Sequence, residues 1–385
     1  MLTRWISFGS LGAFILLGPL GLSSCGSGAP GGALKSVYGA PSGVPVGSSG
    51  DDLWWGEQIA GEDGTADVRI SHRTDGALRE VPMPTDLKIL TTMVSAGPGK
   101  MWVIGSPDGK RLVVVQVDAE GQVLSDRSED FEVFENEDTY GVATARSGHG
   151  GVILDLSTGA GRRLYRLHGE AFELMTIPEG TGSPIPLTVR GEDDIWFERN
   201  YILVHYEDGT WTDIPNSIPP QSPRLLTFDD SGVGYSLASG VVEYEGPYTD
   251  GIAAKVFTSI QRIENNQVET LRLELEGPYR QNNYAVSVIG VLAKPDGGFA
   301  WLGGMERGGA FTKESWVVAR AGDTTSIAAA DTSLYYFGDT CTASCSSPAS
   351  LADVLEDGTF LLNAGPSTEH GGAIHMLVGS AEDLP

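Results

Sequence analysis

Short hydrophobic runs recur along the whole chain, each directly after a turn rich in Asp, Gly or Pro. Such turn residues supply the capped or positive-φ conformations that tight turns need. The runs are almost continuously apolar, which is typical of strands buried on both faces. Seven runs fit this description: residues 53–56, 101–105, 151–156, 195–198, 233–237, 299–303 and 359–363. The pattern therefore predicts one structural unit repeated about seven times.

Each buried run is followed by a strand of a different kind, in which apolar and polar residues alternate. Clear examples are residues 67–73, 112–117 and 201–206. This alternation predicts half-buried strands, and the Asp-Gly, Glu-Gly or Asn-Asn pairs that follow them are hairpin turn signals. Short fourth strands come next, for example at residues 78–82, 172–178 and 211–215. Each unit is thus expected to form four antiparallel strands.

Repeated four-stranded units of roughly 50 residues, with many glycines, are typical of a β-propeller. We therefore expect an all-β fold, with residues 51–385 forming a single propeller of seven four-stranded blades. Six or eight blades are also compatible with the pattern, because the last unit has no recognisable fourth strand. Ring closure is then expected to borrow a strand from residues 34–48. A two-sheet sandwich is the alternative, but seven regular units are too many for it.

The unit at 192–214 resembles the Asp-x-Trp and His-x-x-Asp-Gly-x-Trp repeats of bacterial secreted propellers. The matching residues are Asp194, Ile195, Trp196, His205, Tyr206, Asp208, Gly209 and Trp211. The resemblance implies a fold and no catalytic residue. His72 and His205 lie at similar places on third strands, so we expect structural roles for both. The acidic pairs at 193–194 and 229–230 are expected to cap turns.

The first 24 residues have the character of an export signal. Arg4 is their only charge, and residues 5–22 are almost wholly apolar or small. The run Leu22-Ser23-Ser24-Cys25 resembles the lipobox of bacterial lipoproteins, which implies a diacylated Cys25 at the mature N-terminus. The alternative is an ordinary signal with an incidental Cys. Gly26 at the next position would favour the outer membrane under the enterobacterial sorting rule. Residues 25–50 are expected to form a flexible Gly/Ser/Pro-rich tether.

The composition sets limits on partners and on cysteine chemistry. The net charge is −26, and no Lys/Arg cluster could follow a phosphate backbone, so nucleic-acid binding is not expected. With Cys25 assigned to lipid, Cys341 and Cys345 remain as a pair in an export compartment that permits disulfides. A two-cysteine metal site is the rival interpretation, but no partner residue has zinc-site spacing. We expect no metal and no cofactor.

The sequence carries no Gly-x-Ser-x-Gly elbow, HisGlu-x-x-His motif, P-loop or EF-hand loop. Metal binding by Glu369, His370 and His375 is conceivable, although the spacing is unremarkable. No catalytic residue is therefore predicted.

The repeat is interrupted by long insertions in units five to seven, at residues 239–254, 276–283, 303–314 and 333–348. In a four-stranded blade, loops from second to third strand and between blades lie on one face of the ring. Aromatic and Arg residues on such loops suit recognition of a ligand. The candidate binding residues are Tyr244, Tyr248, Tyr279, Arg280, Arg307, Phe311, Tyr335 and Tyr336. Merely elongated surface loops are the alternative.

These features predict a lipid-anchored propeller of the bacterial cell envelope, attached to the membrane through its N-terminal lipid. It would act as a binding scaffold for a protein, peptide or glycan. The alternative is a secreted propeller hydrolase or lyase acting on carbohydrate. That chemistry needs converging carboxylates, for which Glu243, Glu245 and Glu306 with Tyr279 are the nameable candidates. A third possibility is a propeller that only packs within an assembly.

Overall fold

The fold was analysed on a computed structural model of the chain. The structure describes residues 34–40, 45–60, 66–83, 87–131, 141–158, 161–178, 182–218, 226–237, 243–245, 255–275, 284–308, 313–322, 326–327, 333–336, 350–367 and 373–380. Within these ranges no helix is long and apolar enough to cross a membrane. The helix found there is the short 3-10 turn η1, Ser128–Asp130.

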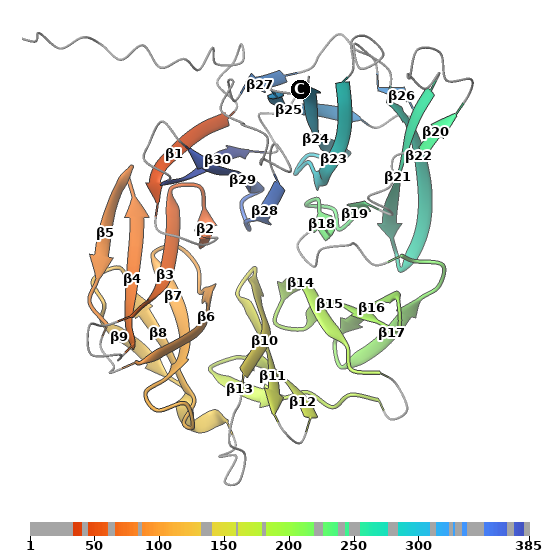
Figure 1. The fold of residues 1–385 in the computed structure, drawn as a ribbon. Coiled ribbons are helices and arrows are strands. Elements are labelled where there is room, and N and C mark those ends of the chain that lie inside the picture. The colour runs from red at the N-terminus through yellow and green to blue at the C-terminus, as the bar shows by residue number, and fades with distance from the viewer. Residues whose placement is uncertain are drawn as a thin grey trace, which may run out of the picture.

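The described strands form seven antiparallel sheets arranged around a ring, as Figure 1 shows. Blade one contains β2 (Val46–Ser49), β3 (Asp52–Ala60), β4 (Ala66–Thr74) and β5 (Ala77–Val81). Blade two contains β6 (Ile89–Ser95), β7 (Lys100–Ser106), β8 (Val113–Asp118) and β9 (Val123–Asp126). Blade three contains β10 (Gly141–Gly148), β11 (Gly151–Thr158), β12 (Gly161–His168) and β13 (Ala171–Leu174). Blade four contains β14 (Ile185–Gly191), β15 (Asp194–Arg199), β16 (Ile202–Glu207) and β17 (Thr210–Ile214).

The remaining three blades complete the ring. Blade five contains β18 (Leu226–Phe228), β19 (Gly234–Leu237), β20 (Glu243–Glu245), β21 (Lys255–Glu264) and β22 (Gln267–Leu275), with β26 (Ser326–Ile327) parallel to β22. Blade six contains β23 (Tyr284–Ala293), β24 (Phe299–Gly308), β25 (Lys313–Gly322) and β27 (Ser333–Tyr336). Blade seven contains β28 (Ser350–Val354), β29 (Thr359–Ser367), β30 (Ala373–Ser380) and the N-terminal strand β1 (Leu34–Ala40). This is the all-β propeller arrangement that the sequence predicts.

The N-terminal strand closes the ring, as predicted. β1 pairs antiparallel with β30, from Leu34 opposite Gly379 to Ala40 opposite Ile374. The first and last parts of the described chain therefore share blade seven. Residues 46–49, the next strand along the chain, belong to blade one. The propeller therefore begins before residue 51, and the predicted tether of residues 25–50 is wrong for these two strands because both pair within sheets.

The seven hydrophobic runs are second strands, as predicted: β3, β7, β11, β15, β19, β24 and β29. They are buried because neighbouring sheets pack against both of their faces. In blade two, six of the seven β7 residues are buried. One core cluster joins Trp102 of blade two to Tyr165 and Phe172 of blade three. The core is thus divided among the contacts between neighbouring blades.

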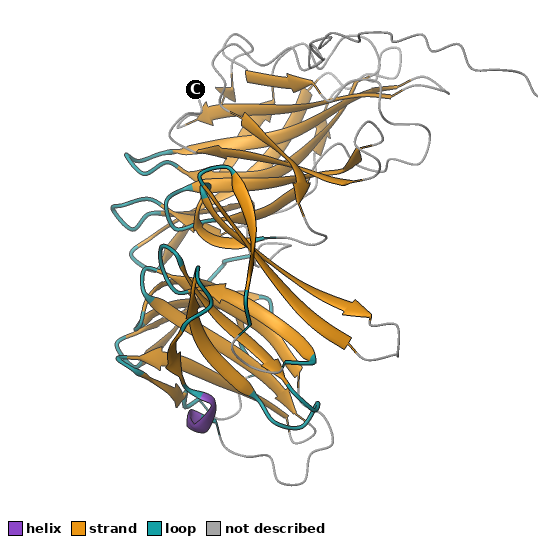
Figure 2. Cartoon of the chain, turned by 90° about the vertical axis from the view of Figure 1, so that its left-hand side faces the viewer, coloured by secondary structure: helices purple, strands orange, loops and turns teal. Residues whose placement is uncertain are grey.

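The two faces of the ring differ in their connections. Described turns from first to second strand and from third to fourth strand share one face, which we call the turn face. Several are two-residue turns with positive φ, such as His149-Gly150 (φ 48° and 85°) and Asp208-Gly209 (φ 47° and 82°). In Figure 2 the described loops gather mostly along one side, while strand pairs project on the other.

One predicted loop is instead largely strand. Residues 303–314 were expected to form an insertion loop, but β24 continues to Gly308 and pairs in register with β25 from Lys313. The glycines at 303, 304 and 308 favour a loop in isolation. Continuous cross-strand pairing overrides that local preference.

Candidate functional site

The predicted site residues fall in the least described part of the chain. Tyr244, Arg307, Tyr335 and Tyr336 lie on strands β20, β24 and β27. The others lie outside the described residues: Cys25, Tyr248, Tyr279, Arg280, Phe311, Cys341 and Cys345. The expected loop position is therefore wrong for the four strand residues, because cross-strand pairing continues through them. Their role in binding, the lipidation and the disulfide stay predictions.

The His residues of the third strands belong to structural units on the turn face. In blade one, His72 Nε2 lies 2.6 Å from Asp52 Oδ1, and the His72 ring stacks on Trp54 with centroids 4.1 Å apart. The same Asp carboxylate accepts a hydrogen bond from the backbone N–H of Gly99 in blade two, at 2.9 Å. The unit therefore links two blades, as the structural interpretation of these residues requires.

Blade four repeats this unit. His205 Nε2 lies 2.9 Å from Asp194 Oδ1, and His205 stacks on Trp196 at 4.2 Å. The other ring nitrogen, Nδ1, lies 2.8 Å from Asn266 Oδ1 on the β21–β22 turn of blade five. Burial of Asp194 opposes its ionisation, but the His205 contacts and the charge of Arg190 lower the pKa of this carboxyl.

The acidic pairs at the turns have two different structural roles. Asp229 caps its turn as predicted, accepting hydrogen bonds from the backbone N–H groups of Ser231 and Val233. Asp193 instead forms an ion pair with Arg166 of blade three. Asp193 was expected to cap its turn, but its carboxylate pairs with a guanidinium that the neighbouring blade brings to it.

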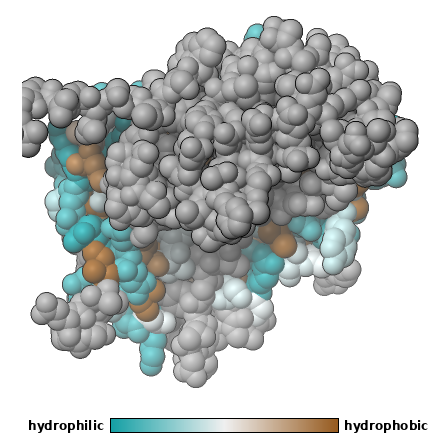
Figure 3. Space-filling model, turned by 45° about the horizontal axis from the view of Figure 1, so that its top comes forward, coloured by the Kyte–Doolittle hydropathy of each residue, from teal (hydrophilic) through white to brown (hydrophobic). Residues whose placement is uncertain are grey.

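Few large hydrophobic residues are exposed among the described ones. They lie on outer strands, on the first strand of blade two, on one hairpin and after β17: Leu78, Ile89, Val123, Leu124, Leu174, Tyr201 and Ile218. Figure 3 shows hydrophobic residues in small groups among hydrophilic ones over the described part of that view.

A cavity of about 1140 Å³ occupies the centre of the ring. Its wall is formed mainly by the first strands and first turns, and every blade contributes to it. One contributing residue from each blade is Val46, Ser95, Arg146, Thr188, Thr227, Pro295 and Glu356. Because a first strand is the terminal strand of its sheet, one row of its backbone N–H and C=O groups is left for the cavity. The wall is therefore polar even where its side chains are apolar.

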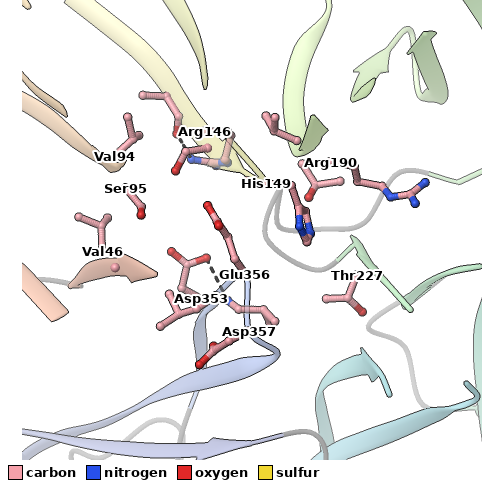
Figure 4. Close-up of a pocket in the computed structure, with 18 of the residues that line it drawn as sticks. Val46, Val94, Ser95, Arg146, His149, Arg190, Thr227, Asp353, Glu356 and Asp357 are labelled. Atoms are coloured by element: carbon pink, nitrogen blue, oxygen red, sulfur yellow. Dashed lines mark hydrogen bonds between the residues drawn. The ribbon is translucent and has the colours of Figure 1, made fainter. Parts of the chain in front are cut away.

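Glu356 is the carboxylate that reaches into this cavity from the β28–β29 turn (Figure 4). Burial raises the pKa of this carboxyl above its usual value. The backbone N–H and the charge of His149, on the β10–β11 turn, partly oppose that rise, whereas neighbouring Asp357 adds to it. Blades three and seven thus meet across the turn-face mouth of the cavity.

Sequence reasoning placed Glu356 and His149 only as turn residues. The signal that could have found them is their shared position. Both lie on first turns, which surround the ring axis, and both have longer side chains than the Gly, Asp and Ser common in such turns. Their proximity depends on the blade order, which the sequence pattern alone leaves open.

Part of the face opposite the turn face is raised. β24 has ten residues, whereas β15 of blade four has six. β3 and β29 have nine residues each. In blade five the second strand β19 has four residues, and it is the third strand β21 that has ten. In blade three, β11 has eight. Four extra residues lengthen a strand by about 13 Å. These longer strands of blades five, six, seven and one form a continuous arc, which we call the extended rim.

Within the described residues, no group of three or more His, Cys, Asp or Glu side chains could hold a metal ion.

No protein-family model and no curated protein matches the chain. Solved structures resemble it only distantly. One is a puromycin hydrolase complexed with PGG, with 13% identity and a TM-score of 0.36, over 85% of this chain and 59% of that one. Another is the Bacteroides ovatus xyloglucan PUL GH43B, with 11% identity and a TM-score of 0.30, over 91% and 97%.

A third is the extracellular domain of a putative one-component system from B. thetaiotaomicron, with 12% identity and a TM-score of 0.30, over 77% of this chain and 49% of that one. The chain thus spans about three fifths of the puromycin hydrolase. At these TM-scores none of the three supports an argument about function.

Proposed function

We propose that this chain is a lipid-anchored binding scaffold of the bacterial cell envelope that holds a protein, peptide or glycan on its extended rim. The observation that carries the proposal is the rim itself. In blade four, strands of six residues are long enough to form a blade of the closed ring. The longer strands of four neighbouring blades are therefore not needed to close the ring. Their additional length forms a raised surface on one side of the propeller.

The connections flanking the rim are those that carry the predicted recognition residues. β20 with Tyr244 follows the second strand of blade five, and Arg307 lies near the end of β24. On the same face, Tyr201 occupies the β15–β16 hairpin, and the residue is 85% exposed. Its φ of 63° is unusual for a bulky residue and is more common at functional sites.

The lipid anchor would orient this surface. Leu34 of β1 pairs with Gly379 and so begins at the turn face, because Gly379 lies next to the β28–β29 turn through Phe360. Nine residue steps separate Cys25 from Leu34, and an extended chain of that length reaches at most about 32 Å. A lipid on Cys25 would therefore hold the turn face near the bilayer and direct the extended rim away from it.

The test compares binding of the mature protein in detergent to arrayed envelope glycans and peptides. One variant lacks residues 305–308 and 313–316, four from each strand. Because equal, even numbers are removed, the remaining residues of β24 and β25 keep their cross-strand partners and point to the same side of the sheet as before. The control variant carries Asp75→Asn and Asp208→Asn, two exposed turn-face positions whose positive φ Asn tolerates.

We expect the trimmed rim to weaken binding about tenfold or more and the control to leave binding unchanged. Circular dichroism establishes that both variants are folded. Equal binding by the trimmed variant, or no binding by the wild type, would refute the scaffold. Carbohydrate turnover lost in Glu306→Gln would instead support the hydrolase alternative. Incorporation of a palmitate analogue that is abolished in Cys25→Ser tests the anchor separately.

A further inference from the structure

We propose that the central cavity is a second binding site, which takes a primary ammonium group on a flexible chain and pairs it with the carboxylate of Glu356. This site lies at the turn-face mouth of the ring and is independent of the extended rim. Its ligand could be a free polyamine or the lysine side chain of a peptide, because both present the same chemical group.

The size and the wall of the cavity suit such a ligand. Its volume of about 1140 Å³ slightly exceeds the usual range of small-molecule sites, so a flexible chain can enter it. An ammonium group needs several acceptors at once, since it has three N–H donors. The first-strand edges provide rows of backbone carbonyls, and Thr92 and Thr188 line the cavity among them. The hydroxyl of Thr227, which also lines it, already accepts a hydrogen bond from the backbone N–H of Ala293 at 2.8 Å.

The charges of the lining select a cation over an anion. The lining carboxylates are Asp229, Asp230, Asp353, Glu356 and Asp357, and the lining guanidinium groups are those of Arg146 and Arg190. Arg190 is already engaged, with Nη1 3.3 Å from Asp194 Oδ2 and its guanidinium 4.7 Å from the centre of the Phe228 ring. The lining therefore carries an excess of negative charge.

Glu356 is the carboxylate best placed to receive the ligand. It projects into the cavity from the tip of its turn (Figure 4). The backbone N–H of His149 on another blade favours its ionised form. Its raised pKa shows that burial and Asp357 penalise the ionised form more than the His149 contacts favour it. An ammonium beside this carboxylate would supply the missing positive charge.

The test is calorimetric titration of the full mature protein with spermidine. A separate titration uses a tripeptide that contains lysine with a free side-chain amine and is blocked at both termini. The acetyl-lysine form of that peptide, which lacks the positive charge, is the matched negative probe. The key variant is Glu356→Gln, which keeps the acceptor for the His149 N–H. The control is Asp296→Asn, an exposed carboxylate on the equivalent turn of blade six outside the cavity lining.

We expect one site for a cationic probe, binding about tenfold weaker in Glu356→Gln and unchanged in Asp296→Asn. Preference for spermidine or for the peptide identifies the source of the ammonium group. Because the pKa of Glu356 is raised, wild-type affinity should fall as the pH is lowered towards that pKa, and the Gln variant should lack this dependence.

Equal affinity in Glu356→Gln, or binding lost equally in Asp296→Asn, would overturn the proposal, as would no binding of either cationic probe. The trimmed-rim variant separates the two sites. It should bind the cation normally, whatever the outcome of the scaffold test.

Discussion

Asp52 offers the sharpest test of how the blades are held together, because one carboxylate connects two of them. Its Oδ1 lies 2.6 Å from His72 Nε2 and accepts a hydrogen bond from Trp54 Nε1 at 3.0 Å. Its Oδ2 accepts from Ser48 Oγ at 2.6 Å and from the Gly99 backbone at 2.9 Å. We predict that Asp52→Asn destabilises the propeller, and that it does so only at pH values where Asp52 is ionised.

The magnitude follows from the pKa of the carboxyl group. Burial alone would raise it, but the hydrogen bonds from His72, Ser48, Gly99 and Trp54 outweigh burial and lower the pKa from 3.8 to about 2. One pKa unit corresponds to about 1.4 kcal/mol, so the ionised form contributes about 2 kcal/mol to stability. The Asp52 side chain is only 13% exposed, so solvent screening reduces this contribution little.

The sign of the pH dependence is fixed by the direction of the shift. A lowered pKa means that the unfolded chain binds a proton more readily than the folded one. The stabilisation by the ionised Asp52 carboxylate is therefore complete above about pH 3.8 and disappears as the pH falls through about 2. Asn cannot ionise, so the difference in stability between wild type and variant should shrink over this window.

Urea unfolding followed by circular dichroism, at about pH 7, 5 and 3, measures the prediction. We expect a loss of about 2 kcal/mol in Asp52→Asn at the two higher pH values and a smaller loss at the lowest. Asp75→Asn, at an exposed turn position of the same blade, serves as the control and should be nearly neutral. A variant as stable as wild type at pH 7, or a loss that does not vary with pH, would refute the reasoning.

Two further substitutions test contacts between other blades by the same unfolding measurement. Gly148→Ala would place a Cβ 2.1 Å from the backbone oxygen of Val189 in blade four. We therefore expect the free energy of unfolding to fall by about 1–3 kcal/mol. An unchanged urea midpoint would show that the two blades move apart there without cost. Asn266→Gly removes the partner of His205 Nδ1, while Gly tolerates the φ of 59° at this position. We expect it to lower the free energy of unfolding by about 1 kcal/mol. The control Asn265→Gly, at a φ of 51° and without a His205 contact among the described residues, should lower it less.

The sequence predicted the strands well because each blade repeats the same local rules. Trp54 and Trp196 lie at the third position of their second strands, opposite His72 and His205 on the third strands. Such cross-strand positions follow from alternation and turn length alone. The recurrence also indicated correctly that these residues are structural.

Contacts between distant parts of the ring could not be predicted in this way. The ion pair of Asp193 with Arg166 requires the relative register of two blades, which no local pattern contains. The approach of Glu356 to His149 requires blades three and seven to lie opposite each other. These contacts depend on how the sheets are packed around the axis, and therefore on the closed ring.

The contacts that connect successive blades gather on the turn face of the propeller. On the turn face, contacts such as Asp52 with Gly99, Asp193 with Arg166 and His205 with Asn266 connect successive blades. These contacts fix each blade near its turns, so strands can lengthen at the other end without disturbing ring closure. The lengths of the second strands vary accordingly, with ten residues in β24 and six in β15. A scaffold stabilised at one face tolerates change at the other, which is where we propose that the protein, peptide or glycan binds.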